Sequence, residues 1–234
     1  VTDCTGRSVN EPVVDVIIAV HNATRPIARA VASALHGHTP TRVTVVAHNI
    51  DPDIIGANLG DLLADGRVRL VGLRDGIHSP AGPMNHGLDL ATAEFIALLG
   101  SDDEFERDAI DAWVGIARAT HADVVIAPTL QDDRAPDPYP PVRIGRTATL
   151  DGDRDRLSYR SAPLGLVSRR RFPALRFAEG LASGEDLPVM VTLWFSGARV
   201  SFDPGAPSYL IHTDGDDRVT LAPRPVDDDF AFLD

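Results

Sequence analysis

The chain has 234 residues, and its 22 basic and 34 acidic side chains give a formal net charge of −12. Every basic residue is an arginine. The absence of lysine excludes the phosphate-binding lysine of a Walker A loop, the strand-borne lysine of a kinase and Schiff-base chemistry. The acidic balance argues against a nucleic-acid partner, and the single cysteine, Cys4, cannot form an internal disulfide.

The rest of the composition, 44% hydrophobic and 24% charged, fits an enzyme-sized globular unit. No apolar run reaches the roughly 18 residues that a membrane span needs. The first residues show no signal-peptide pattern. We therefore expect a cytoplasmic location.

Strands and helices alternate over the first 130 residues. Near-continuous apolar runs predict buried strands at residues 13–20, 42–47, 67–73, 95–99 and 123–127. Apolar residues at helical spacing predict helices between Pro26 and Gly37 and at residues 53–65, 84–92 and 107–120. This alternation predicts an α/β fold with right-handed crossovers and a mostly parallel sheet between helices.

The periodicity is lost after residue 130. Residues 131–156 carry four prolines and little pattern, which predicts a long loop of the kind that often acts as a functional lid. Helical spacing returns at 185–197, followed by strand-like pieces at 198–202 and 207–212. The acidic run at 227–229 predicts a solvated tail.

Polar residues follow the carboxyl ends of the predicted strands, which is where open parallel sheets bind ligands. They are His21 and Asn22, His48 and Asn49, Arg74 and Asp75, and Asp102 and Asp103. No G-x-G-x-x-G follows the first strand, which argues against a dinucleotide-dependent dehydrogenase.

Adjacent carboxylates end the fourth predicted strand, in the run from Phe95 to Glu104. Hard divalent cations prefer such oxygen ligands, and Mg²⁺ or Mn²⁺ held by Asp102 would let an acidic cleft accept a diphosphate. The structural alternative is that Ser101, Asp102 and Asp103 merely cap the helix expected near Arg107.

Three further features each allow a functional and a structural interpretation. Glu185 and Asp186 begin a predicted helix, where the dipole would stabilise a carboxylate acting as general base, or where they would serve only as first-turn acids. His212 ends an apolar run and is a metal ligand or a structural histidine. The run of Arg169, Arg170 and Arg171 is a phosphate clamp or a solvated rim.

Taken in order, these segments resemble family 2 glycosyltransferases of the GT-A fold. Residues 14–22 are similar to the family's V-S-V-I-I-P-V-Y-N strand, and residues 82–91 loosely match its G-x-x-x-A-R-N-x-G-L-x-x-A segment. Residues 94–103 match E-Y-I-x-F-L-D-S-D-D, residues 184–186 match G-E-D, and His212 falls where many members have a metal-binding histidine.

The resemblance implies a GT-A, Rossmann-like sheet with a C-terminal acceptor-side subregion. Residues 13–130 would bind a UDP-, dTDP- or GDP-linked sugar, and residues 131–212 would hold the base and the acceptor within the same domain. Residues 1–12 would be a flexible N-terminus and 213–234 an acidic tail. The donor-binding residues it implies are Val20, His21, Asn22, His48, Asn49, Arg74, Asn85, Ser101 and Asp102.

The implied chemistry is metal-dependent transfer of the sugar to a hydroxyl of a glycan or glycoconjugate, with inversion. Asp102 would hold Mn²⁺ or Mg²⁺, with His212 as an additional ligand and Asp103 as a weaker candidate. Asp186, with Glu185 beside it, would be the catalytic base. Arg169, Arg170 and Arg171 would lie on the acceptor or phosphate side.

Two departures from the family pattern keep alternatives open. Gly100 replaces the first aspartate of D-x-D-D, and Ala47, His48 and Asn49 stand where the family has the Asp-Asp that reads the base. The alternatives are a weakened or inactive nucleotide-sugar-binding member and, in another class, a nucleotidyltransferase. Peripheral association with the inner membrane face is a further expectation for the cytoplasmic enzyme.

Overall fold

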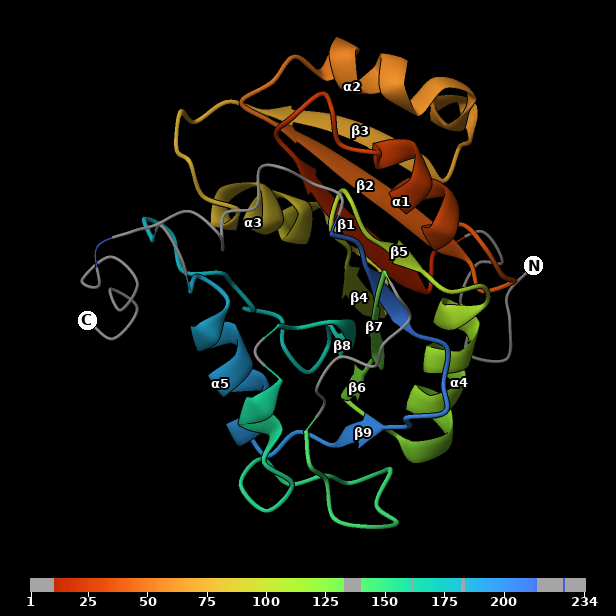
Figure 1. Cartoon of the computed structure of the whole chain (residues 1–234), viewed down its shortest axis with the longest axis vertical. Coiled ribbons are helices and arrows are strands. Elements are labelled where there is room, and N and C mark those ends of the chain that lie inside the picture. The colour runs from red at the N-terminus through yellow and green to blue at the C-terminus, as the bar shows by residue number, and fades with distance from the viewer. Residues whose placement is uncertain (1–10, 133–139, 161, 182–183, 214–224, 226–234) are drawn as a thin grey trace.

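The computed structural model describes residues 11–132, 140–160, 162–181, 184–213 and 225 (Figure 1). The predicted flexible N-terminus and acidic tail lie almost entirely outside these residues. A seven-stranded sheet has the order β3-β2-β1-β4-β8-β6-β9. Its strands are β1 (Val14–Val20), β2 (Thr41–His48), β3 (Val68–Leu73), β4 (Phe95–Leu98), β6 (Val124–Ile126), β8 (Gly165–Ser168) and β9 (Val200–Phe202).

Within the described ranges, five α-helices cover the two faces of this sheet. They are α1 (Ile27–Ala34), α2 (Pro52–Leu59), α3 (Ala81–Leu90), α4 (Ala109–Thr120) and α5 (Leu187–Phe195). Short 3₁₀ helices span Gly60–Ala64 and Leu157–Tyr159. Buried side chains of α1, α2 and α4 form one core, and those of α3 and α5 form the other. Figure 1 shows α1 and α4 on the right of the sheet and α3 and α5 on its left.

The predicted α/β fold with a mostly parallel sheet is confirmed. β1 pairs in parallel with β2 and β4, and β2 pairs in parallel with β3. All residues of β1 except Ala19 are buried, as expected for a strand with helices on both faces. Helix α3 begins at Ala81 rather than at residue 84, because Pro83 falls in the first turn, where its missing N–H has no partner to lose.

The sequence pattern missed β8, which enters the sheet antiparallel to both β4 and β6. The strand is short, and a glycine opens it and a serine ends it, so it shows no continuous apolar run. That glycine is required: Gly165 has φ +127, and a Cβ there would lie 2.0 Å from the carbonyl oxygen of Val125. Only a residue without a side chain lets β8 approach β6 this closely.

A second, three-stranded sheet has the order β5-β10-β7 and was also not predicted as a sheet. Its strands are β5 (Glu104–Phe105), β7 (Thr129–Gln131) and β10 (Tyr209–Ile211). β5 lies between the Asp102–Asp103 turn and α4, so this turn does not cap that helix. The small sheet brings the C-terminal residues of the described chain next to the end of β4.

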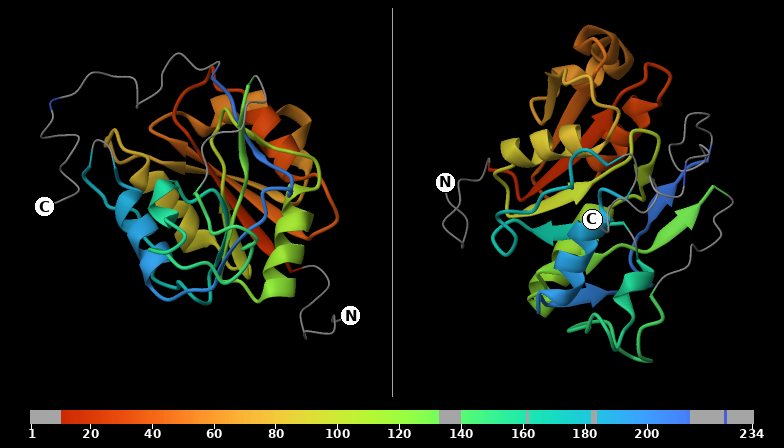
Figure 2. Two further views of the ribbon diagram at one scale, coloured as in Figure 1. Left: turned by 60° about the horizontal axis from the view of Figure 1, so that its bottom comes forward. Right: turned by 90° about the vertical axis from the view of Figure 1, so that its left-hand side faces the viewer.

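The predicted long loop is described at residues 131–132 and 140–156, and the carboxylate of Asp155 connects several parts of the second stretch. Asp155 is fully buried and accepts from Arg143 Nε at 2.7 Å and from the backbone N–H of Asp151 at 2.7 Å. The Arg143 guanidinium holds the pKa of Asp155 well below its usual range. The loop lies at the end of the molecule opposite α2 (Figure 2).

Among the described residues, no helix is long and apolar enough to span a membrane.

Candidate active site

The carboxyl ends of four parallel strands meet at one edge of the sheet. The register pairs Val20 with Ala47, Ala47 with Gly72 and Ile17 with Leu98, so the residues that follow these strands share that edge. The predicted donor-side residues His21, His48 and Arg74 are therefore brought to the same side of the molecule as the turn that contains Ser101 and Asp102.

Two arginines from the segment after β1 bind Asp102. Arg25 Nη1 donates to the Asp102 carboxylate, and Arg29 Nη2 donates to its backbone carbonyl. The Arg25 and Asp102 side chains are only 9% and 13% exposed. Arg25 thus neutralises the carboxylate that the sequence predicts as a metal ligand, and this cation was not among the predicted site residues.

Asp103 turns toward the small sheet. Its Oδ2 accepts from the Tyr209 hydroxyl at 2.6 Å, and this hydroxyl in turn accepts from the Gly100 N–H at 2.9 Å. Burial, followed by the charge of Asp103, raises the pKa of Tyr209 well above its ordinary value, so the phenol stays protonated as a donor. A Cβ on Gly100 would lie 2.4 Å from Asp103 Oδ2, so this arrangement has no room for the family's aspartate at position 100.

His212 lies beside this turn. Its backbone N–H donates to Asp103 Oδ1 at 3.0 Å, and its ring Nδ1 lies 2.8 Å from Asp132 Oδ1. Its Nε2 is buried and makes no hydrogen bond within the described residues, although Glu104 Oε1 lies 3.3 Å away. A histidine whose Nδ1 is anchored by a carboxylate has the geometry of a metal ligand that coordinates through Nε2.

The residues present fit a divalent cation, but they are not assembled around one. Within the described part of the chain, no three His, Cys, Asp or Glu side chains are gathered into a group that could hold a metal. The buried Nε2 of His212 and the oxygens of Asp102 are the ligand types that Mn²⁺ accepts. In this structure one oxygen of the Asp102 carboxylate is paired with Arg25.

A second polar cluster joins the ends of β2 and β3. The Asp75 carboxylate lies 2.8 Å from His48 Nε2 and accepts from Asn49 Nδ2 at 3.1 Å. The Asn49 side-chain oxygen accepts the backbone N–H groups of Asp75 and Gly76 at 3.1 and 3.0 Å. Hydrogen bonds, the strongest from the Ile77 N–H and others from His48 and Asn49, lower the pKa of Asp75 to about 2. Asn49 therefore shapes this loop, and Asp75 presents an ionised carboxylate where the family's Asp-Asp is missing.

The other predicted donor-side residues occupy different surroundings. Asn22 accepts from the backbone N–H and hydroxyl of Thr24 at 2.9 and 3.0 Å, which forms the turn before α1. Val20 and Ser101 are buried, and Arg74 is exposed after β3. Asn85 is buried in α3 and bonds the chain at residues 177–179, so its amide is directed toward the protein.

The predicted arginine clamp lies at the opposite edge of the sheet. Ser168 pairs with Phe95 at the amino end of β4, and Arg169 donates to the carbonyl oxygens of Ala93 and Thr92 at 3.1 and 3.3 Å. Arg171 Nη2 donates to Ser196 O at 2.8 Å, and Arg170 is exposed. We therefore do not assign these three arginines to the donor phosphates, because the antiparallel entry of β8 directs them away from the end of β4 where Asp102 lies.

Asp186 immediately precedes α5, next to Glu185. Burial, followed by the charge of Glu185, raises the pKa of Asp186 to about 6. The sequence predicted that the helix dipole would stabilise the ionised form, but desolvation outweighs that effect here. The result is a stronger base that is still mostly ionised at neutral pH, which is the condition that favours general-base catalysis.

This pKa predicts a pH-dependent stability cost. A carboxyl group with a folded-state pKa above its ordinary value stabilises the fold when protonated, and this contribution is lost as the pH rises through about 6. Asp186→Asn should therefore be more stable than the wild type at about pH 7.5, on the order of 2 kcal/mol, but not at about pH 3.5. Urea unfolding at both pH values measures the difference. The exposed Asp153→Asn should show no such trend, and a pH-independent gain for Asp186→Asn would contradict the prediction.

Comparison with known proteins identifies the family. The sequence profile of glycosyl transferase family 2 matches residues 15–174, more than half of the chain, so the chain belongs to this family. Succinoglycan biosynthesis protein ExoO of Rhizobium meliloti is 28% identical over 214 residues, covering 86% of this chain and 61% of its own length. ExoU of the same organism is 30% identical over 201 residues, covering 79% and 57%. The chain thus spans about three-fifths of the length of these relatives.

Solved structures with the same fold include S. aureus TarS. A TarS fragment has a TM-score of 0.75 at 18% identity, covering 85% of this chain and 60% of that chain. The fragment in complex with UDP-GlcNAc has a TM-score of 0.75 at 19% identity, covering 90% and 61%. The predicted GT-A fold is confirmed by this likeness.

Proposed function

We propose that this protein is an inverting glycosyltransferase that moves a sugar from a nucleotide-sugar to a hydroxyl of a glycan or glycoconjugate. The observation that carries the proposal is Asp186, a desolvated carboxylate with its pKa raised to about 6, in the segment that matches the family's G-E-D. Family membership sets aside the nucleotidyltransferase alternative.

In the proposed reaction, the acceptor hydroxyl oxygen forms a bond to the anomeric carbon. The bond from that carbon to the diphosphate oxygen breaks, and the nucleoside diphosphate leaves with the electron pair. Asp186 takes the hydroxyl proton, a contribution of about 10²–10⁴-fold to the rate. Attack opposite the leaving group inverts the anomeric configuration.

We propose a UDP-linked sugar as the first donor to test, ahead of dTDP- and GDP-linked sugars. The support is that a structure with this fold binds UDP-GlcNAc. The ionised Asp75 carboxylate beside His48 and Asn49 is a hydrogen-bond acceptor at the end of β2, where the family pattern has its base-reading carboxylates. His21 and Arg74 complete the polar lining of this edge in the proposal.

Asp102 and His212 are the residues that would hold Mn²⁺ or Mg²⁺. When bound, the cation supplies positive charge that stabilises the leaving diphosphate as a Lewis acid. Arg25 and Arg29 place guanidinium groups at the same edge, where they would pair with a donor phosphate. Because the chain has no lysine, such cationic contacts must come from arginine.

A cell-surface polysaccharide is the acceptor class that the succinoglycan biosynthesis relatives support. Location in the cytoplasm, with peripheral association at the inner membrane face, stays a prediction from the sequence. So does the division into a donor half (residues 13–130) and an acceptor half (131–212) of one domain.

Calorimetric titration of UDP, GDP and dTDP, with and without Mn²⁺, tests the proposed function. We expect one nucleotide to bind at least tenfold more tightly with Mn²⁺ present. Titration of AMP, which has no diphosphate to bridge, is the control and should show no Mn²⁺ effect. If no nucleotide binds in a metal-dependent way, the enzyme proposal is wrong. Metal-dependent binding without turnover of any donor would favour the non-catalytic alternative.

A further inference from the structure

The segment that connects β8 to the proposed base, Asp186, runs along helix α3. β8 is antiparallel to β4, so it ends at the amino edge of β4, where Ser168 pairs with Phe95. Asp186, at the start of α5, follows 18 residues later in the sequence. The amino end of α3 lies near the carboxyl ends of the parallel strands. This follows from the closeness of Gly82, in the first turn of α3, to the carboxylate of Asp75, which comes after β3.

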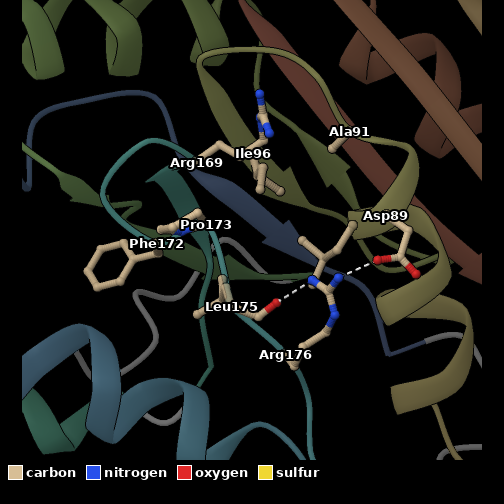
Figure 3. Close-up of a pocket in the computed structure, with 9 residues that line it drawn as sticks. Asp89, Ala91, Ile96, Arg169, Phe172, Pro173, Leu175 and Arg176 are labelled. Atoms are coloured by element: carbon tan, nitrogen blue, oxygen red, sulfur yellow. Dashed lines mark hydrogen bonds and ion pairs between the residues drawn. The ribbon is translucent and has the colours of Figure 1, made fainter.

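Side chains one turn apart on α3 hold this returning segment. Near the end of α3, Asp89 pairs with Arg176, whose Nη1 also donates to the Leu175 carbonyl (Figure 3). One turn earlier on α3, the side-chain amide of Asn85 forms hydrogen bonds with both backbone groups of Phe177, the residue after Arg176. Its Nδ2 donates to Phe177 O at 3.1 Å, and its Oδ1 accepts from Phe177 N–H at 2.9 Å.

The two interactions that join α3 to this segment, Asp89 with Arg176 and Asn85 with Phe177, differ in burial. The Asp89 and Arg176 side chains are 57% and 46% exposed, so their ion pair contributes little. Asn85 is 6% exposed, and its Nδ2 also donates to Glu179 Oε1 at 3.0 Å. Both amide hydrogens and the amide oxygen of Asn85 are thus used by the segment at 177–179.

The segment at 177–179 is also hydrogen-bonded to the backbone of Glu185, next to Asp186. Ala178 N–H, directly after Phe177, donates to Glu185 O at 3.0 Å. Glu185 precedes Asp186, whose carbonyl accepts from Met190 N–H at 2.9 Å in the first turn of α5. One chain of hydrogen bonds therefore links Asn85, through Phe177 and Ala178, to the start of α5.

We propose that Asn85 is a positioning residue for Asp186: it docks the segment at 177–179 onto α3 and so sets where the carboxylate stands relative to the acceptor hydroxyl. This rests on the proposed function of Asp186 as the base. It replaces the donor-binding role that the sequence predicted for Asn85. A misplacement of about 1 Å caused by a change away from the reacting atoms can cost about 10²-fold in rate.

Asn85→Asp tests the proposal with almost no change in side-chain shape. A carboxylate cannot donate to Phe177 O and would face Glu179 Oε1, so the segment should detach from α3. We expect kcat to fall about 10–100-fold while the Kd of the donor nucleotide stays within twofold. The matched control is Asp89→Asn on the same helix, which should leave kcat within twofold.

Two readouts do not require turnover. Hydrogen exchange of the Phe177 and Ala178 amides should become faster in Asn85→Asp but not in Asp89→Asn. The NMR-measured pKa of Asp186 should fall toward its ordinary value of 3.8, because the released segment exposes the carboxylate to water. Glu185 is the charged neighbour that acts on this pKa, and the substitution leaves it in place. If Asn85→Asp does not fold, Glu179→Ala removes one exposed partner, and kcat should fall about threefold with the same exchange change.

Unchanged kcat and unchanged exchange in Asn85→Asp would overturn the proposal. A donor Kd that rises as steeply as kcat falls would also overturn it, because Asn85 would then act on the donor. Failure of the proposed function looks different: Asp186→Asn would turn over at the wild-type rate, while the exchange of Phe177 and Ala178 would still report whether Asn85 holds the segment.

Discussion

Asp186→Asn is expected to lower kcat by about 10²–10⁴-fold, because the amide keeps the shape of the carboxylate but cannot accept the hydroxyl proton. The Kd of the donor nucleotide should stay unchanged, since this residue acts on the acceptor. Measuring kcat by release of the nucleoside diphosphate, alongside calorimetric Kd values, separates the two effects. The raised pKa also predicts that wild-type kcat falls below about pH 6, as the base becomes protonated.

Glu185→Gln is the matched control, because it changes the neighbouring carboxylate and leaves the proposed base. Removing the charge of Glu185 should lower the pKa of Asp186 and move the acidic limb of the kcat profile to lower pH. The maximal kcat should stay within about tenfold of the wild type. If Glu185→Gln abolished turnover and Asp186→Asn did not, the two roles would be reversed.

Asp102→Asn is expected to weaken Mn²⁺-dependent nucleotide binding by about 100-fold, because an amide is a poor ligand for a hard cation. Titration with Mn²⁺ present and absent measures this. Nucleotide binding without metal should change far less, since Asp102 is proposed to act on the nucleotide through the cation.

Asp103→Asn is the control for that experiment. Asp103 is engaged by the Tyr209 hydroxyl and the His212 N–H, which marks it as a structural acceptor. Its substitution should reduce stability by about 1–3 kcal/mol, because a buried hydroxyl loses a charged acceptor, while the Mn²⁺ effect on nucleotide affinity persists. Loss of the metal effect in Asp103→Asn but not in Asp102→Asn would show that the other carboxylate is the ligand.

The strand pattern of the donor half followed from the sequence because its cause is local. The predicted strands β1, β2, β4 and β6 are mostly apolar because they are mostly buried between the helices. β3 lies at the edge of the sheet and is only partly buried, but its residues are still mostly apolar. The polar residues after these strands share one edge because the strands are parallel. The sequence pattern missed β5, β7 and β8 because each is short and contains a polar residue or a glycine, and because its place depends on the strands it pairs with.

In the candidate site, too, some residues could be predicted from the sequence and others depend on the fold. Asp102, His212 and Asp186 could be named from the order of motifs along the chain. No local pattern predicts the roles of Arg25, Arg29, Glu104, Asp132 and Tyr209, because these roles depend on which groups the side chains contact in the folded chain. Arg25 precedes α1 and Arg29 lies in its first turn, but this position along the sequence does not say which carboxylate they contact.

The sequence by itself determined the class of fold, the family and the kinds of groups available: carboxylates, a histidine and arginine in place of lysine. The tertiary structure decided their partners. It set Arg25 on Asp102, turned Asn85 toward the chain at 177–179, placed Arg169 at the opposite edge, and raised the pKa of Asp186 through burial. Strand identity comes from neighbours along the chain, whereas desolvation and ion pairing come from segments that meet only when the sheet is assembled.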